Sequence, residues 1–317
     1  MSTAAPYASV APSLTSVLPQ YVHKTDPAEV LLTGWGRTGE DSYTVTARWP
    51  RGHGFYTPTG GLPDPLLVAE TIRQTIPLLS HCAYDAPMNH RQSWSDFGYT
   101  LDGAAYASAA ELAAEDTEDA VELRITCTDV VRRGGRLCSM TMRVDILLAG
   151  VTVGMARTTF GNHSRAIYQR LRGAYADLER SIGQALAPAA PIAAARVGRA
   201  YLHDVVLSAT DDPNRMRLRV DLGHPVLFDH PVDHVPGMLM LEAARQAALA
   251  MAYPQTMLLV GIDCQFTRYG ELDAPCWLQA EPLPADTAGQ VRLLLSAVQN
   301  GVCIFATTAT LEPVRGN

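Results

Sequence analysis

The chain has 317 residues and a formal net charge of −7; 47% of its residues are hydrophobic and 18% are charged. This length fits two domains of roughly 150 residues each, and the composition is that of a globular protein able to bury a large core. The negative charge argues against a nucleic-acid-binding protein, because contacts with phosphates require a basic surface.

Sequence patterns argue against two further classes of protein. The six cysteines show neither the CxxC nor the Cys/His spacing of a metal site, so we expect buried, reduced thiols and no bound metal. No run of about 18 apolar residues is present to cross a membrane. Residues 1–20 lack the regions of a secretory signal and are rich in Ala, Ser, Pro and Thr, so we expect a flexible N-terminus on a cytoplasmic protein.

Residues 21–162 are predicted to form a first domain. Pro77 is expected to help end its apolar helix, because proline cannot donate the backbone hydrogen bond of a helix interior. A second, Ala-rich surface helix is expected at 104–119. Alternating polar and apolar patterns predict the strands, and unbroken apolar spacing predicts the first helix. In chain order these are strands at 30–35 and 42–49, the helix at 64–79, and strands at 90–101, 121–132, 137–148 and 151–160.

Residues 163–198 are predicted to be a connecting helix and an Ala/Pro-rich linker, and residues 199–317 a second domain. This domain is expected to hold strands at 205–209 and 215–221, a helix at 236–252, and strands at 257–267, 276–281, 291–299 and 302–311. A buried helix wrapped by an antiparallel sheet, twice, is an α+β arrangement. Two such sheets can pair edge to edge within one chain.

The two apolar helices carry the same polar motif. Glu242, Arg245 and Gln246 each lie 172 positions after their counterparts Glu70, Arg73 and Gln74. The segments upstream, 29–33 and 204–208, also match, which indicates a tandem duplication. On a buried helix such an acid and guanidinium form either a self-satisfied ion pair or a functional site, and the pattern alone leaves both open.

The stretch from Phe228 to Gln246 (FDHPVDHVPGMLMLEAARQ) resembles the AfsA-type family of bacterial enzymes, which make A-factor and related γ-butyrolactone signalling molecules. Its helical part is similar to the central helix of the hot-dog fold in β-hydroxyacyl-ACP dehydratases and acyl thioesterases. Val22-His23-Lys24 with residues 29–33 is similar to the family's N-terminal signature. The resemblance therefore covers nearly the whole chain and implies two hot-dog repeats that form an internal pseudo-dimer.

The resemblance implies an acyltransferase that moves a β-ketoacyl group from an acyl carrier protein thioester to dihydroxyacetone phosphate, without a cofactor. It also implies Glu70, Glu242 and Arg245 as active-site residues. We expect burial to raise the pKa of such a carboxylate, so that it can take the proton of the attacking hydroxyl. A guanidinium suits a phosphate or a β-keto oxygen. No cysteine or Gly-x-Ser-x-Gly motif supports an acyl-enzyme, so direct transfer is favoured.

The start of the second helix is the expected place for the thioester carbonyl, as in hot-dog enzymes, where the acyl chain lies in a tunnel between repeats. Pro236 has no N–H, so the amides of Gly237 and Met238 are the candidate donors to the carbonyl oxygen. Residues 62–65, at the start of the first helix, contain no glycine, which favours one complete site over two.

Other side chains are candidates for supporting roles. His230 is the nearest match to the catalytic histidine of the dehydratases, but it lies two residues closer to the glutamate, which argues against dehydration. Asp233 and His234 can act as bases or stabilise the turn. Arg73 is either a catalytic partner or only the ion-pair partner of Glu70. Gln246 either supports the active site or is an ordinary member of its helix motif.

Two other functions stay open. One is a hot-dog dehydratase or thioesterase acting on acyl-ACP or acyl-CoA, and the other is a non-catalytic protein that binds an acyl signal. A carrier-protein surface is also open: Arg215, Arg217 and Arg219 alternate along a predicted strand, whose basic face is either solvated or docks an acidic carrier.

Overall fold

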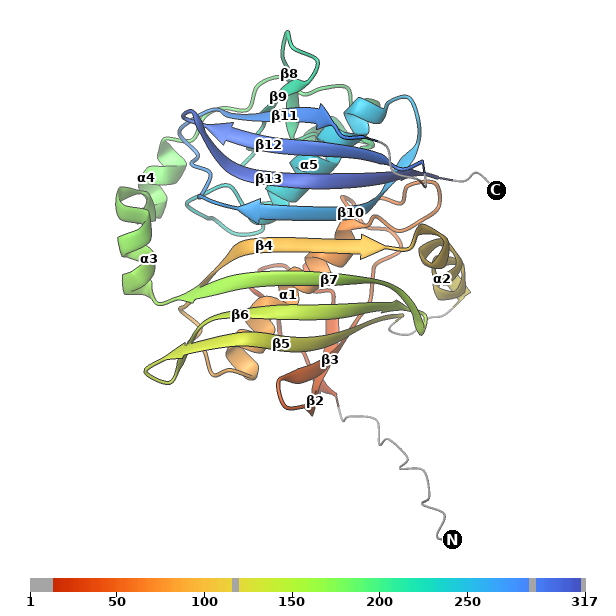
Figure 1. Cartoon of the computed structure of the whole chain (residues 1–317). Coiled ribbons are helices and arrows are strands. Elements are labelled where there is room, and N and C mark those ends of the chain that lie inside the picture. The colour runs from red at the N-terminus through yellow and green to blue at the C-terminus, as the bar shows by residue number, and fades with distance from the viewer. Residues whose placement is uncertain (1–13, 116–119, 285–288, 315–317) are drawn as a thin grey trace.

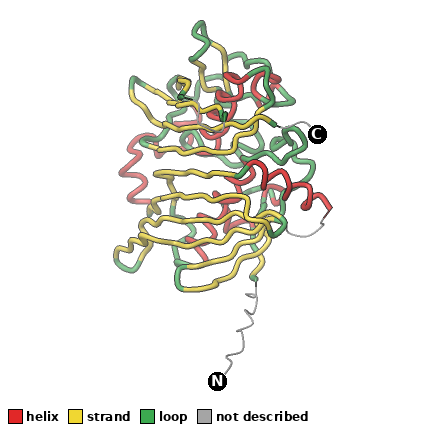
Figure 2. The backbone as a smooth tube through the Cα atoms, turned by 45° about the vertical axis from the view of Figure 1, so that its right-hand side comes forward, coloured by secondary structure: helices red, strands yellow, loops and turns green. Residues whose placement is uncertain are grey.

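The strands of both halves form one antiparallel sheet, and the central helices lie against one of its faces (Figures 1 and 2). This computed structural model describes residues 14–115, 120–284 and 289–314. The thirteen strands of the described residues follow the order β1-β2-β3-β5-β6-β7-β4-β10-β13-β12-β11-β9-β8. The order falls into two halves that meet between β4 and β10, as expected for two repeats paired edge to edge.

The first repeat wraps its sheet around the long helix α1, whose side chains are buried along most of its length. Its elements are β1 (Thr15–Ser16), β2 (Leu32–Gly39), β3 (Ser42–Ala47), α1 (Leu66–Cys82), β4 (Arg91–Leu101), α2 (Gly103–Glu115), β5 (Val121–Arg133), β6 (Arg136–Leu148) and β7 (Val151–His163).

The second repeat wraps a smaller half-sheet around α5, which is equally apolar and buried. Its elements are β8 (Leu207–Ala209), β9 (Arg215–Leu218), α5 (Gly237–Ala252), β10 (Met257–Phe266), β11 (Cys276–Pro282), β12 (Val291–Gln299) and β13 (Val302–Pro313). The short helices α3 (Arg165–Arg172) and α4 (Leu178–Gly183) lie between the repeats in sequence and stand beyond one end of the strands (Figure 1).

The junction between the repeats is a regular antiparallel pairing of β4 with β10, in which Gly98 faces Asp263. A Cβ atom on Gly98 would lie 3.0 Å from the carbonyl oxygen of Ile262, so the absence of a side chain helps the two strands approach closely. Helices α1 and α5 also contact each other, and the buried apolar side chains of both repeats form one contiguous core. The two halves are therefore repeats that share a core.

Two details differ from the expectations. Pro77 lies inside α1, which continues to Cys82, so the prediction that it helps end the helix is wrong. Leu78, Leu79 and their neighbours are buried, and this packing outweighs the lost backbone hydrogen bond. Near the N-terminus, Thr15 and Ser16 pair with β2 rather than hanging free.

Some of the expected features lie on residues that the structure does not describe, and the expected domain boundaries are not tested by it. The rest of the predicted flexible N-terminus up to residue 13, and residues 116–119 of the predicted surface helix, lie outside the described residues. The domain boundaries at 162 and 199 stay a prediction. Within the described ranges, no helix is long and apolar enough to cross a membrane.

Candidate active site

Glu70, on α1, is buried among cationic and amide donors of its own repeat. Arg73 binds it with a fork, Nε to Oε2 at 2.8 Å and Nη2 to Oε1 at 2.9 Å. The ammonium of Lys24 lies 3.2 Å from Oε1, and the amide of Gln74 donates to the same oxygen at 2.9 Å. One carboxylate thus has two cationic partners.

Glu242, on α5, has the corresponding surroundings in the second repeat. Arg245 donates to it at 2.8 and 3.1 Å, and Arg199 adds a second fork at 2.8 and 2.7 Å. Gln246 donates to the carboxylate as well. The structure therefore unites Glu242, Arg245 and Gln246 as the sequence motif predicted, and adds a second guanidinium.

Each cluster has one cation from outside its central helix, Lys24 or Arg199, and the same type of backbone turn positions both. Lys24 follows a 3-10 helix (Pro19–Val22) and a left-handed residue, His23; Arg199 follows a 3-10 helix (Ala194–Val197) and a left-handed residue, Gly198. The backbone amide of each cation closes the turn on the first residue of its 3-10 helix, at 3.4 Å for Lys24 and 3.0 Å for Arg199. The turn therefore directs both cations toward the central helix of their own repeat.

The amides of Gln74 and Gln246 tie the central helices to these upstream segments. Gln74 accepts from the backbone N–H of Leu31 and donates to the carbonyl of Glu29. Gln246 does the same with Val206 and Asp204. This repetition supports the structural role that the motif left open for the two glutamines.

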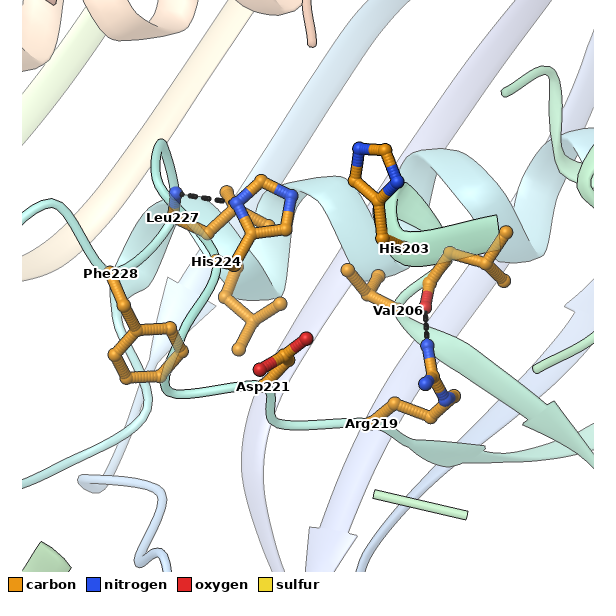
Figure 3. Close-up of a pocket in the computed structure, with 9 residues that line it drawn as sticks. His203, Val206, Arg219, Asp221, His224, Leu227 and Phe228 are labelled. Atoms are coloured by element: carbon orange, nitrogen blue, oxygen red, sulfur yellow. Dashed lines mark hydrogen bonds between the residues drawn. The ribbon is translucent and has the colours of Figure 1, made fainter. Parts of the chain in front are cut away.

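A second pair of equivalent residues, His53 and His224, organises the loops before the helices. The Nδ1 atom of His224 accepts the backbone N–H of Val226 at 3.2 Å. It also accepts that of Leu227 at 3.1 Å (Figure 3). His53 accepts those of Phe55 and Tyr56 in the same way. These contacts assign a turn-stabilising geometry to His53.

The clusters differ in how they meet the other repeat. Arg199 reaches the first repeat, where its Nη1 lies 3.2 Å from Asp64 Oδ2 and donates to the carbonyl of Phe55, and its guanidinium stacks on the Phe55 ring. Asp64, Arg199, Glu242 and Arg245 have side chains at most 3% exposed. The Glu242 cluster is therefore a sealed ionic network across the repeat interface.

The Glu70 cluster is more open, and it faces the loop of the second repeat that contains Asp229 and His230. The Arg73 side chain is 22% exposed, and that of His230 is 40% exposed. Asp229, beside His230, accepts the backbone N–H groups of Thr25 and Asp26 and so fixes this loop next to Lys24. The charges of Arg73 and Lys24 also act on the pKa of His230, which burial lowers. His230 thus lies with the Glu70 cluster of the other repeat.

Both buried glutamates have a low pKa, so the expectation that burial raises it is wrong. Burial alone does act to raise the pKa of Glu70, but the charges of Arg73 and Lys24 outweigh it and lower the pKa to about 2. Arg199 and Arg245 do the same for Glu242, whose pKa also falls to about 2. Each carboxylate is ionised at neutral pH and is a weak base while both cations remain in place.

The starts of the two central helices differ in a way that bears on thioester binding. At α1, Asp64 Oδ1 accepts the N–H of Leu66 at 2.9 Å, so an acidic side chain occupies this end. At α5, the residue before Gly237 is Pro236, which provides no side-chain cap. A negatively charged oxygen is favoured at a free helix start and disfavoured beside a carboxylate.

Trp94 of the first repeat covers the start of α5. A Cβ atom on Gly237 would lie 2.6 Å from Trp94 Cε3, so the ring packs directly on this glycine. The ring stacks on Phe97 and contacts Phe266, and its buried Nε1 has no hydrogen-bond partner among the described residues. A carbonyl bound by Gly237 and Met238 would therefore meet an aromatic wall from the other repeat.

Asp233 and His234 bind each other and the connecting helix. His234 Nδ1 lies 2.7 Å from Asp233 Oδ1, which also accepts from Tyr168 at 2.6 Å. Arg172 lies 3.5 Å from Asp233 Oδ2 and binds Glu271 with a fork. This network fixes the turn that leads into α5.

Sequence reasoning missed Lys24, Arg199 and Asp64 as members of these clusters. A signal was present for the two cations, because Lys24 precedes Glu29 by the same five positions that separate Arg199 from Asp204. Nothing in the sequence shows that Asp64 meets Arg199, since the pair is far apart in the chain and joins different repeats.

Two small cavities lie near the second repeat, and neither borders Glu70 or Glu242. The one in Figure 3, beside His203, Asp221 and His224, has a volume of about 10 Å³, room for roughly one water molecule. No group of three or more His, Cys, Asp or Glu side chains among the described residues is arranged to hold a metal ion.

Two buried helices wrapped by one shared antiparallel sheet, each with an equivalent Glu–cation cluster, define a double hot-dog protein. The fold resembles the 12:0-ACP thioesterase from Umbellularia californica with a TM-score of 0.50, at 8% identity over 87% of this chain and 99% of that one. The sequence matches the model of the A-factor biosynthesis hotdog domain (AfsA) at residues 7–162 and 182–315. The chain belongs to this family.

Relatives from three Streptomyces species bear the name 2-oxo-3-(phosphooxy)propyl 3-oxoalkanoate synthase. The protein from Streptomyces virginiae is 42% identical over 92% of this chain and 97% of its own length. Those from Streptomyces coelicolor and Streptomyces griseus are each 37% identical, over 90% and 91% of this chain and 88% and 93% of their own lengths. The similarity thus spans both repeats.

Proposed function

We propose that this protein is an acyltransferase that joins a β-ketoacyl group to the hydroxyl of dihydroxyacetone phosphate, in the biosynthesis of a γ-butyrolactone-type signalling molecule. The observation that carries the proposal is the full-length similarity to relatives named as synthases of a 2-oxo-3-(phosphooxy)propyl 3-oxoalkanoate. That name describes an ester whose alcohol part is dihydroxyacetone phosphate and whose acid part is a 3-oxo acid.

The donor is a thioester of the 3-oxo acid carried by an acyl carrier protein, and the reaction takes place in the cytoplasm. The acceptor hydroxyl oxygen attacks the thioester carbonyl, the C–S bond breaks, and an ester and a thiol form. The hydroxyl proton passes to a carboxylate and then to the departing sulfur. The amides of Gly237 and Met238, at the uncapped start of α5, stabilise the oxyanion.

The acceptor binds at the Glu70 cluster, with its phosphate on Arg73 and Lys24. Arg73 is 22% exposed, whereas Arg199 and Arg245, the guanidinium groups of the other cluster, are buried. A phosphate also suits the fork of donors that a guanidinium offers. When the phosphate draws these cations away from Glu70, the influence that holds the carboxylate's pKa near 2 weakens. Glu70 then becomes a better base at the moment when the hydroxyl is in place.

Glu242 and Arg245 stay in the proposed site as residues on which activity depends. Their sealed position argues that they hold the repeats in register around the Glu70 cluster, while the family resemblance implies direct contact with substrate. The two roles differ in what a conservative change does. Arg245→Lys lowers stability in the first role, and weakens use of the acceptor or of the β-keto donor in the second.

The experiment is an incubation of the purified protein with a β-ketoacyl thioester, with and without dihydroxyacetone phosphate, with products weighed by mass spectrometry. We expect the phosphorylated ester, formed only when the acceptor is present. A free acid formed at the same rate without acceptor indicates a thioesterase, an enoyl product a dehydratase, and unchanged thioester a non-catalytic binder. The same assay with Arg73→Lys should raise the KM for the acceptor more than it lowers kcat.

A further inference from the structure

We propose that the outer face of α3 is the docking surface for the acidic carrier protein that delivers the acyl group. The inference rests on the proposed function, because it names the partner that would bring the donor to that site. It assigns to α3 a role that the sequence offered to the strand with Arg215, Arg217 and Arg219.

The outer face of α3 combines exposed apolar and cationic side chains. Ile167 and Leu171, four residues apart and so on one face, are 48% and 58% exposed. Arg170 precedes Leu171 directly and Arg165 is the first residue of the helix; both are exposed and have no ion-pair partner among the described residues. The helix holds no acidic residue, so its two exposed arginines and its exposed apolar side chains complement an acidic partner that also has an apolar patch.

The inner face of α3 is fixed to the turn that starts α5. Tyr168 donates to Asp233 at 2.6 Å, and the buried Arg172 donates to the Asp233 carbonyl at 2.9 Å while forking onto Glu271. Asp233 precedes Gly237 by only four residues. A partner seated on α3 is therefore held close to the place where the thioester carbonyl binds.

Figure 1 shows why a partner can reach this helix. Helix α3 stands beyond the ends of β7, β4 and β10, at the side of the junction between the repeats, and projects from the body of the sheet. Its eight residues carry two large exposed apolar side chains, which is too small a surface for stable insertion into a membrane. A small, charged patch instead suits a brief encounter between proteins.

The rival strand is less suited to docking. Arg219, which follows the end of β9, donates to the backbone carbonyls of Ala189 and Val205, and Arg215 stacks on Trp277 at 4.4 Å. These arginines are thus engaged in holding their own repeat together. They provide a matched control, because reversing the charge of Arg215 and Arg217 changes the protein's net charge as much as reversing Arg165 and Arg170.

The test compares two donors with the same β-ketoacyl group, one on a holo carrier protein and one on a short pantetheine-like thiol. For Arg165→Glu/Arg170→Glu we expect kcat/KM with the carrier to fall about tenfold or more and to lose much of its salt dependence, with little change for the short thioester. Leu171→Ser should also lower kcat/KM for the carrier alone. Arg215→Glu/Arg217→Glu should leave both donors unaffected.

Binding of fluorescently labelled acyl carrier, followed by anisotropy without acceptor, tests the surface independently of turnover. The α3 variant should weaken binding while the β9 variant should not. The proposal is overturned if the α3 change affects both donors equally, affects neither, or if only the β9 change weakens the carrier. It is also overturned if the α3 face binds anionic vesicles or a second copy of this chain instead. Failure of wild-type protein to transfer acyl groups from either donor, with carrier binding intact, contradicts the proposed function and leaves the docking surface standing.

Discussion

Lys24 and Arg199 occupy equivalent positions in the two repeats, and each binds the glutamate of its own central helix. Lys24 makes one contact with Glu70, at 3.2 Å, whereas Arg199 forks onto Glu242 and continues to Asp64 of the other repeat. The duplicated turn thus serves a local cluster in one repeat and an interface in the other. The difference lies in the side chain, since a guanidinium has donors for several acceptors at once.

Arg199→Lys should therefore lower the free energy of unfolding by about 2 kcal/mol or more, because a lysine keeps the charge but cannot serve Glu242, Asp64 and the Phe55 carbonyl together. Urea denaturation measures the change. Arg157→Lys is the control, since Arg157 pairs with Asp96 on the surface and the change should cost less than about 0.5 kcal/mol. Equal stability of both variants would mean that the cross-repeat pair is not a significant link.

Glu70→Gln should lower kcat by about a hundredfold or more, because the amide keeps the shape but cannot accept a proton. The protein should stay folded, since Arg73 is 22% exposed and can be solvated by water when it loses its carboxylate partner. Steady-state transfer assays measure kcat, and thermal melts show whether the variant stays folded. Glu242→Gln should lower the melting temperature as well as the turnover, because Glu242 belongs to the buried ionic network that joins the two repeats. If Glu242→Gln abolishes transfer at an unchanged melting temperature while Glu70→Gln stays active, the proton acceptor is Glu242.

Gly237→Ala should destabilise the protein by about 1–3 kcal/mol, because the new methyl group would collide with the Trp94 ring. Transfer should fall too, since the first turn of α5 must shift away from the thioester. Chemical denaturation and the transfer assay are the measurements. Gly183→Ala, at the end of α4, provides the comparison: nothing lies near its missing side chain, so stability should stay the same or rise slightly. Wild-type stability of Gly237→Ala would show that Trp94 is loosely packed.

Stability should fall as the pH drops from about 6.5, partly through His23. Burial and the nearby His81 and Arg73 lower the pKa of His23 from 6.5 to about 3. Between these values the unfolded chain binds a proton that the folded chain does not, so the free energy of unfolding rises with pH in that window, by up to about 1.4 kcal/mol per pH unit for one proton.

The measurement is urea denaturation from pH 5 to 7.5. This range stays above the window between about 4.5 and 2 in which the ionised forms of Glu70 and Glu242 lose their contribution as pH falls. His23→Asn is the matched variant, because asparagine tolerates the left-handed backbone at this position. The slope of its free energy of unfolding against pH should be smaller than that of the wild type by up to about 1.4 kcal/mol per pH unit, which corresponds to one proton. An identical slope would assign the pH dependence to other groups, such as His90, His163 and His230.

Much of the fold was accessible from the sequence because its signals are local. Alternation predicted the strands, and unbroken apolar spacing predicted both central helices within a few residues of their bounds. The repeated Glu-x-x-Arg-Gln motif predicted the duplication and the contacts of Glu70 with Arg73 and of Glu242 with Arg245, since residues three and four apart on a helix lie side by side. The end of α1 was missed because packing of the residues after Pro77 outweighs a local helix-breaking signal.

The sequence by itself determined the family, the two repeats and the pairs formed within each helix. The tertiary structure alone decided which residues of one repeat meet those of the other: Asp64 with Arg199, Trp94 with Gly237, and the loop of His230 with the Glu70 cluster. It also reversed the expected direction of the glutamates' pKa, because a carboxylate's proton affinity depends on the sum of all charges around it. Burial can be inferred from an apolar helix, but the second cation of each cluster arrives from a distant turn, and only the folded chain brings it there.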